Sequence, residues 1–154
     1  MKYLNSQVVF QEFPGETTLA FNITNCPNHC PDCHSKQLWE DIGEELTPHV
    51  IDDIYIKYNY CITCIGIMGG DASKEDVYDI ARYIKENYPT LKVGWYSGCE
   101  TITPDLCNVL DYIKLGPYMK ECGDMTQSTT NQRLYKKEDG YWKDITYMFN
   151  LKKV

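Results

Sequence analysis

The chain has 154 residues and a formal net charge of −7 at pH 7, and its length predicts a single domain over residues 1–154, too short for a complete eight-unit barrel. The acidic balance argues against a nucleic-acid partner, because phosphate binding needs clustered Lys and Arg side chains. The opening MKYLNSQVVFQ lacks the regions of a secretory signal, and no apolar run reaches the roughly 18–20 residues of a membrane span, so we expect a cytoplasmic protein with no membrane partner.

The first half of the chain alternates strand and helix signals. Residues 7–10 (QVVF) favour a short strand, and residues 18–24 (TLAFNIT) alternate as a half-buried strand does. Thr47-Pro48 marks the start of a helix, with the threonine as N-cap and the proline at the first helical position. Residues 61–68 (CITCIGIM) are almost continuously apolar, which is typical of a strand buried on both faces of a parallel sheet.

The alternation continues in the second half. A helix is predicted from Ser73 to before Pro89, a strand at residues 92–97, a short helix after Pro104 and a strand at residues 112–115. These βα repeats predict an α/β fold with a mostly parallel sheet, and any barrel formed by a chain of this length must be partial.

The C-terminal part has a different pattern. Residues 123–132 are polar and rich in turn formers, as expected of a loop or lid. Residues 133–136 and 141–145 flank the turn signal Asp139-Gly140, which predicts a C-terminal hairpin.

Three cysteines stand close together in the chain. Cys26, Cys30 and Cys33 form a C-x3-C-x2-C pattern, and Pro27 and Pro31 exclude a helix there. Thiolate is the ligand that iron–sulfur clusters and zinc prefer. A four-iron cluster held by three cysteines leaves one iron open to substrate, whereas a structural zinc normally takes four ligands. The other cysteines are expected to be small buried hydrophobic residues, namely Cys61, Cys64, Cys99, Cys107 and Cys122.

The C-x3-C-x2-C pattern resembles the cluster motif of the radical S-adenosylmethionine (SAM) enzymes. The lead-in FQEFPGETTLAFNITNC, the run CPDCHS, MGGD at 68–71 and TTNQR at 129–133 are similar to the activating proteins of anaerobic ribonucleotide reductase. The resemblance covers nearly the whole chain and implies a partial (β/α) barrel of the radical SAM type. One departure is Asp32, which stands where many radical SAM enzymes carry an aromatic residue before the third cysteine.

The resemblance also implies two cofactors, a single [4Fe-4S] cluster and SAM. The cluster ligands would be Cys26, Cys30 and Cys33. The residues around SAM would be Asp32, Cys33 and His34 at the adenine, and Gly69, Gly70 and Asp71 at the methionyl end. The Asp71 carboxylate would meet the SAM ammonium. From the residues alone, Gly69-Gly70 fits equally a tight turn between a strand and a helix.

The implied activity is that of an oxidoreductase, a glycyl-radical activase. It would receive an electron from a donor such as flavodoxin, cleave SAM reductively and generate a glycyl radical on the large subunit of anaerobic ribonucleotide reductase. We expect no catalytic side chains beyond the cluster and the SAM site. Asn131, Gln132 and Arg133 follow a run of hydroxyl side chains, and the resemblance suggests that Asn131 and Arg133 contact the partner's glycine loop. An ordinary hairpin start is the alternative.

Two other functions are open. A small-molecule radical SAM enzyme similar to 7-carboxy-7-deazaguanine synthase shares the short GE-containing lead-in, but TTNQR argues against it. A zinc-stapled binding module without catalysis would need a fourth ligand, from His29 or His34, and would give no reason for MGGD. We expect neither histidine to bind metal, because loop histidines beside a cluster more often donate hydrogen bonds.

Overall fold

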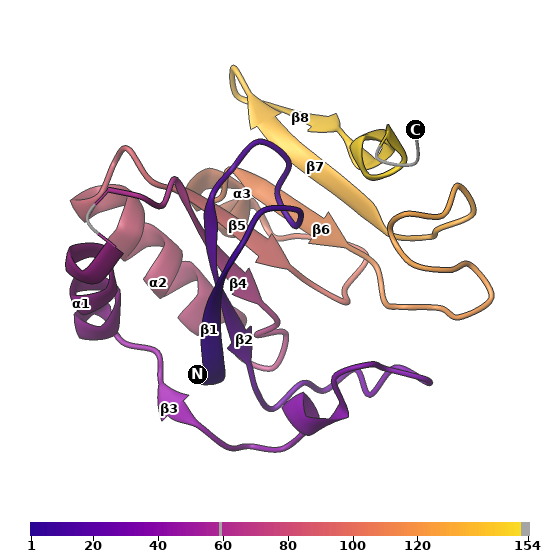
Figure 1. Cartoon of the computed structure of the whole chain (residues 1–154), viewed down its shortest axis with the longest axis horizontal. Helices are drawn as coiled ribbons and strands as arrows, with labels where there is room; N and C mark the ends of the chain where they lie inside the picture. Colours follow the sequence, from indigo (N-terminus) through magenta and orange to yellow (C-terminus); the bar gives the residue numbers. More distant parts are fainter. Residues whose placement is uncertain (59, 152–154) are drawn as a thin grey trace.

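The computed structural model describes residues 1–58 and 60–151, which build one eight-stranded sheet in the order β3-β1-β2-β4-β5-β6-β7-β8 (Figure 1). The strands are β1 (Lys2–Val9), β2 (Thr18–Ile23), β3 (Glu44–Glu45), β4 (Cys64–Met68), β5 (Lys92–Tyr96), β6 (Tyr112–Leu115), β7 (Arg133–Glu138) and β8 (Tyr141–Asp144). The helices are α1 (Pro48–Tyr58), α2 (Lys74–Asn87) and α3 (Pro104–Val109), with 3-10 turns η1 (Lys36–Trp39) and η2 (Thr146–Phe149).

The prediction of a mostly parallel sheet in a partial (β/α) barrel of the radical SAM type is wrong. Only the central pairs β2-β4, β4-β5 and β5-β6 are parallel, and the pairs on both sides of them are antiparallel. The outer strands β3 and β8 do not pair with each other, so this mixed sheet stays open. The reason lies in the connections: parallel pairing needs a long crossover, and the crossovers of this chain join only the four central strands.

Most single elements lie where the sequence predicts them. The C-terminal hairpin is confirmed by the β7-β8 pairing, and the Thr47 hydroxyl accepts a hydrogen bond from the Val50 N–H at 3.3 Å in the first turn of α1. The first strand is longer than predicted, and β3, η1 and η2 were not predicted. Within the described ranges, none of the helices has the length and apolar content needed to span a bilayer.

The two faces of the sheet carry different cores. Ile65, Val93 and Trp95 point to the face that the helices cover, and all three are almost fully buried. On the opposite face the fully buried ring of Phe13 lies over the sheet, where a Cβ on Gly94 would overlap the ring. The glycine in β5 therefore makes room for the segment between β1 and β2 to close this face.

A buried carboxylate joins the amino-terminal ends of the central strands. Glu16 accepts hydrogen bonds from Lys92 at 2.6 Å, the Thr63 hydroxyl at 2.6 Å and the Tyr112 hydroxyl at 2.8 Å. Burial disfavours the charged carboxylate, but these hydrogen bonds and the Lys92 charge outweigh it and hold the pKa of Glu16 below its usual value. This network stabilises the end of the sheet remote from the cysteine loop.

The parallel strands β2, β4, β5 and β6 all end on the same side of the sheet, as in other parallel sheets, and we call this row of strand ends the carboxyl edge. The cysteine loop follows β2 there and extends away from the sheet (Figure 1). Gly69-Gly70-Asp71 follows β4, Ser97-Gly98 follows β5, and Gly116 follows β6. The fold therefore gathers the predicted motifs at a single edge even though it is not a barrel.

Candidate metal centre

The three cysteines lie on the loop between β2 and η1. Cys26, Cys30 and Cys33 are half-buried and have free thiols. The Cys33 N–H donates to the Cys30 carbonyl at 3.1 Å, which forms a tight turn between two of the thiols. The Ser35 N–H lies 3.4 Å from the Cys33 sulfur and donates to it. Such N–H donors stabilise thiolate sulfur and tune iron–sulfur sites.

The backbone of the loop is sharply turned. Asn25, His29 and Asp32 have φ values of +59°, +41° and +58°, and Asn, His and Asp are the residues most often found in this left-handed region after glycine. At the base of the loop the Cys26 N–H donates to the Leu38 carbonyl at 3.0 Å. The three cysteines therefore lie on a loop of local turns rather than on a helix or a strand.

Neither loop histidine turns toward a shared ligand position with the thiols. The His29 ring stacks on Trp39 with centroids 4.5 Å apart, and the His34 ring lies 5.6 Å from the ring of Tyr118. Asp32 forms an exposed ion pair with Lys120 at 3.5 Å. These contacts place the segment after β6 against the cysteine loop.

A mainly apolar pocket of about 590 Å³ lies between that segment and the loop. It is lined by Asn28, Cys30, Pro31, Asp32, Pro117, Tyr118, Met119, Lys120 and Glu121. The volume is within the range of small-molecule sites, roughly 300–1,000 Å³. One of the predicted cluster ligands, Cys30, opens directly into this pocket.

The Asp71 carboxylate ties the cysteine loop to the sheet. One of its oxygens accepts from the Ser97 hydroxyl at 2.5 Å, and the other accepts from the Gly98 N–H at 2.8 Å and the Asn28 amide at 2.6 Å. The same Asn28 amide lies 3.8 Å from the Cys26 sulfur. A Cβ on Gly98 would collide with the Asn28 side chain, so the glycine makes room for this contact. Asp71 therefore links the ends of β4 and β5 to the first half of the loop.

The two glycines before Asp71 are required by the turn itself. Gly69 and Gly70 have φ values of +112° and +100°, and a Cβ on Gly70 would lie 2.7 Å from Val77. The buried Trp95 indole donates to the Gly69 carbonyl at 2.7 Å, so this aromatic residue supports the turn from the core. A branched substitution at Gly70 would thus strain the turn and α2 before it reached any ligand.

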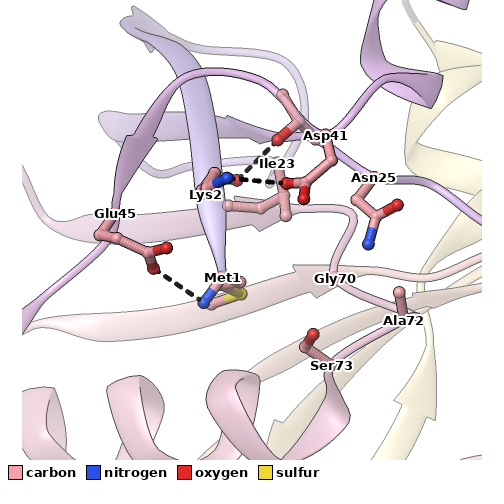
Figure 2. Close-up of a pocket in the computed structure, with 10 residues that line it drawn as sticks. Met1, Lys2, Ile23, Asn25, Asp41, Glu45, Gly70, Ala72 and Ser73 are labelled. Carbon is pink, nitrogen blue, oxygen red and sulfur yellow. Dashed lines mark hydrogen bonds and ion pairs between the residues drawn. The ribbon is translucent and has the colours of Figure 1, made fainter.

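Figure 2 shows a second, smaller pocket of about 240 Å³ where this turn meets the base of the cysteine loop. It is lined by Met1, Lys2, Ile23, Thr24, Asn25, Asp41, Glu45, Gly70, Ala72 and Ser73. Lys2 and Asp41 pair across its rim at 3.2 Å. The pocket is mainly polar, and Gly70 and Asn25 place it beside the motifs that follow β4 and β2.

A buried lysine lies at the same edge of the sheet. Lys114 on β6 is only 7 % exposed and shares a face of the sheet with Tyr112. Its ammonium donates to the carbonyls of Gly116 at 2.9 Å and Ser97 at 3.4 Å. Among the residues that the structure describes, it has no carboxylate ion-pair partner.

The electrostatic surroundings of Lys114 have two opposing parts. Burial lowers the pKa of Lys114 to about 8, because the charged ammonium loses its hydration. The Asp71 carboxylate, and the sulfurs of Cys30 and Cys26 in their thiolate form, act in the opposite direction and favour the ammonium. Asp71 and the predicted cluster ligands Cys26 and Cys30 therefore lie within electrostatic range of the lysine.

The predicted partner residues are not brought together. The Asn131 amide donates to the Pro117 carbonyl at 2.9 Å and so supports the segment that covers the cysteine loop. Gln132 is buried and donates to the Gly116 carbonyl at 3.2 Å. Arg133 is exposed on β7, 4.0 Å from Asp144, and lines a different pocket.

The prediction for the other cysteines is only partly right. Cys64 is fully buried on β4, and burial raises the pKa of its thiol. Cys61 is exposed, so its assignment to the core is wrong, because the strand begins three residues later than predicted. Cys99, Cys107 and Cys122 are partly exposed.

The donor set of the loop fits an iron–sulfur cluster. Within residues 1–58 and 60–151, no three His, Cys, Asp or Glu side chains converge on a position for a single ion. In a four-iron cluster each cysteine binds a different iron, so the sulfurs need not meet at one point. The loop offers three free thiols, and N–H groups donate to the sulfurs of Cys26 and Cys33. These groups suit a cluster in which each thiolate binds its own iron.

Three residues of this edge were missed from the sequence: Asn28, Gly98 and Lys114. A signal existed for the lysine, because a charged residue inside the apolar strand YIKL is unusual. Asn28 and Gly98 have no such signal, since their roles come from a contact between segments about 70 residues apart.

Comparisons with known proteins agree with the cysteine loop. A family model described as a 4Fe-4S single cluster domain matches residues 14–135. The anaerobic ribonucleoside-triphosphate reductase-activating protein of Enterobacteria phage T4 is 23% identical over 146 residues, which cover 87% of this chain and 92% of that protein. No solved structure matches the chain significantly. The similarity to the activating proteins that the motifs indicate is thereby confirmed, and the chain belongs to the 4Fe-4S single cluster domain family.

Proposed function

We propose that this protein is a radical SAM activase that generates a glycyl radical on an anaerobic ribonucleotide reductase. The observation that carries the proposal is the three-cysteine loop tied through Asn28 and Asp71 to the carboxyl edge of the parallel strands. The match to the 4Fe-4S family and the similarity to the phage T4 activating protein support the same function.

In this proposal, Cys26, Cys30 and Cys33 hold one [4Fe-4S] cluster. When bound, the cluster and SAM supply the chemistry, an electron for reductive cleavage of the sulfonium and a carbon radical that takes hydrogen from a glycine. The protein holds the loop rigid through the Asp71 contacts. It also donates N–H groups to two sulfurs, at Cys26 and Cys33.

The SAM site would lie between the cysteine loop and its neighbours. We place the adenosine in the 590 Å³ pocket, which Asp32 lines. The resemblance adds the backbone of Cys33 and His34, which follow Asp32 in the loop. The methionyl end would lie toward Gly70 and Asp71, whose carboxylate is opposite in charge to the SAM ammonium. The Asp71 oxygens accept three hydrogen bonds, and a carboxylate can accept about four, so an arriving ammonium could bind without displacing the main-chain donor.

The partner would be the large subunit of an anaerobic ribonucleotide reductase, with a donor such as flavodoxin supplying electrons in the cytoplasm. The chain is small, and its loops are used around the cysteines, which leaves little structure to enclose a small substrate. A glycine loop of the partner would close the open pocket instead. Asn131 would hold the covering segment in place, and the exposed Arg133 would contact the partner directly.

The test is electron paramagnetic resonance of the reconstituted protein mixed with the large subunit, SAM and dithionite under anaerobic conditions. We expect a stable glycyl radical on the large subunit, and no such radical with the Cys30→Ala variant. Conversion of a free pterin or nucleoside by the isolated protein, without a radical on the large subunit, would refute the proposal and favour a small-molecule radical SAM enzyme.

A further inference from the structure

Lys114 is a buried cation for which the folded chain provides no ion pair. It is 7 % exposed, and its hydrogen bonds go to two main-chain carbonyls. Removing an ammonium from water is unfavourable unless a negative charge compensates it. Asp71 lies within electrostatic range, and the Tyr96 ring lies 5.5 Å from the ammonium. Because neither forms an ion pair with Lys114, a further negative charge nearby would stabilise the ammonium.

The surroundings of Lys114 identify where that charge arises. The carbonyl of Ser97 accepts from Lys114, while the hydroxyl of the same residue donates to Asp71, so the lysine and the carboxylate lie on either side of one residue. Asp71 accepts hydrogen bonds from three neutral donors and keeps its negative charge. The Asn28 amide that donates to Asp71 also donates to the Cys26 sulfur at 3.8 Å. A chain of hydrogen bonds therefore joins Lys114 to that sulfur through Ser97 and Asp71. The sulfurs of Cys26 and Cys30 act on the lysine electrostatically and become permanently charged once they bind iron.

We propose that Lys114 is the counter-charge of the iron–sulfur cluster and raises its reduction potential; the inference rests on the function proposed above. Each cysteine loses its thiol proton when it binds iron, so three thiolates and a 2+ cluster core carry a net charge of −1. Uptake of one electron from an external reductant makes this −2, with no bond formed or broken. A nearby ammonium stabilises the more negative state and makes reduction easier.

The experiment compares reduction potentials of the reconstituted wild type, Lys114→Gln, Lys114→Met and the control Lys143→Met without SAM. The control removes the same charge from a side chain that is 60% exposed on the C-terminal hairpin. Anaerobic titration followed by electron paramagnetic resonance gives the midpoint. We expect each Lys114 variant to disfavour reduction by about tenfold, a shift of about 59 mV to more negative values for a one-electron couple. We expect no shift in Lys143→Met.

Two further measurements separate other roles of the lysine. In urea unfolding of the iron-free protein, the Lys114→Met variant should be at least as stable as the wild type, because an unpaired buried charge has been removed. A marked loss of stability would overturn the proposal and assign Lys114 to the fold. Weaker SAM binding in calorimetry with an unchanged potential would also overturn it, and would make the lysine a contact of the SAM carboxylate.

The inference and the proposed function fail in different ways. If the wild type binds four irons and activates the reductase but the Lys114 variants keep the wild-type potential, only the inference is refuted. If the wild type does not bind an iron–sulfur cluster, the proposed function is refuted and the role of Lys114 with it.

Discussion

Replacing Asp71 should release the cysteine loop from the sheet. Its carboxylate accepts three hydrogen bonds, from Ser97, Gly98 and Asn28. Hydrogen bonds to charged groups contribute roughly 1.5–3 kcal/mol each where they are shielded from water, and less where they are exposed. Two of the three donors are half-buried or buried and Asn28 is exposed, so we expect Asp71→Ala to lower the free energy of unfolding by about 3 kcal/mol.

The Asp71→Asn variant refines this prediction. An amide of the same shape can accept from Gly98 and donate to the hydroxyl of Ser97, which loses the charge but keeps most of the contacts. The expected loss is therefore smaller, about 1 kcal/mol. Both variants should also retain less iron per chain after reconstitution, because the loop that carries the thiols is less ordered.

Urea unfolding of the iron-free protein, with iron analysis after reconstitution, is the assay. Asp79→Ala on the exposed face of α2 is a matched control that should change stability by no more than about 0.5 kcal/mol. If Asp71→Ala were no less stable than Asp79→Ala and kept its full iron content, the role of Asp71 as the anchor of the loop would be wrong.

Three further predictions follow from the same structure. Alanine at any of the proposed ligands should abolish iron binding, whereas Cys61→Ala and Cys107→Ala should leave the iron-to-protein ratio unchanged. Glu16→Gln should destabilise the protein by about 2–3 kcal/mol at pH 7. Because the folded pKa of Glu16 is lowered, the carboxylate stabilises the folded protein fully above the unfolded pKa of about 4.3. This stabilisation is lost as the pH falls through the folded pKa. The difference in stability between Glu16→Gln and the wild type should therefore disappear in acid denaturation curves. Asn131→Ala should free the segment after β6, because the amide that holds the Pro117 carbonyl is lost. We expect faster amide hydrogen exchange at residues 117–121 and a weaker glycyl radical signal on the partner, with neither change in the control Lys143→Met. Unchanged exchange would show that Asn131 does not support this segment.

Elements with a strong local signal were predictable because their causes lie within a few residues. Thr47-Pro48 caps α1, and the β7-β8 hairpin forms around Asp139-Gly140, whose φ values of +50° and +82° suit that turn. The cysteine loop was predictable for the same reason, since two prolines and the spacing of three thiols are written in eight consecutive residues.

The direction of strand pairing was decided only by the tertiary structure. The βα repeats in the sequence suggested a mostly parallel sheet with an antiparallel hairpin only at the C-terminus. They do not show that β1 returns through a turn to pair antiparallel with β2, or that Glu44–Glu45 adds an edge strand. Such pairings depend on contacts between residues far apart in the chain, which local propensity does not report. An open mixed sheet therefore replaced the expected barrel.

The same division applies to the candidate site. The sequence by itself determined that Cys26, Cys30 and Cys33 share one loop and that Asp71 follows a buried strand. Only the folded chain shows the Asn28 amide on Asp71 and the buried ammonium of Lys114 on the carbonyl of Ser97, whose hydroxyl donates to Asp71. The physical reason is that hydrogen bonds and charges act through space, and the parallel crossovers bring segments 43 and more residues apart to one edge of the sheet.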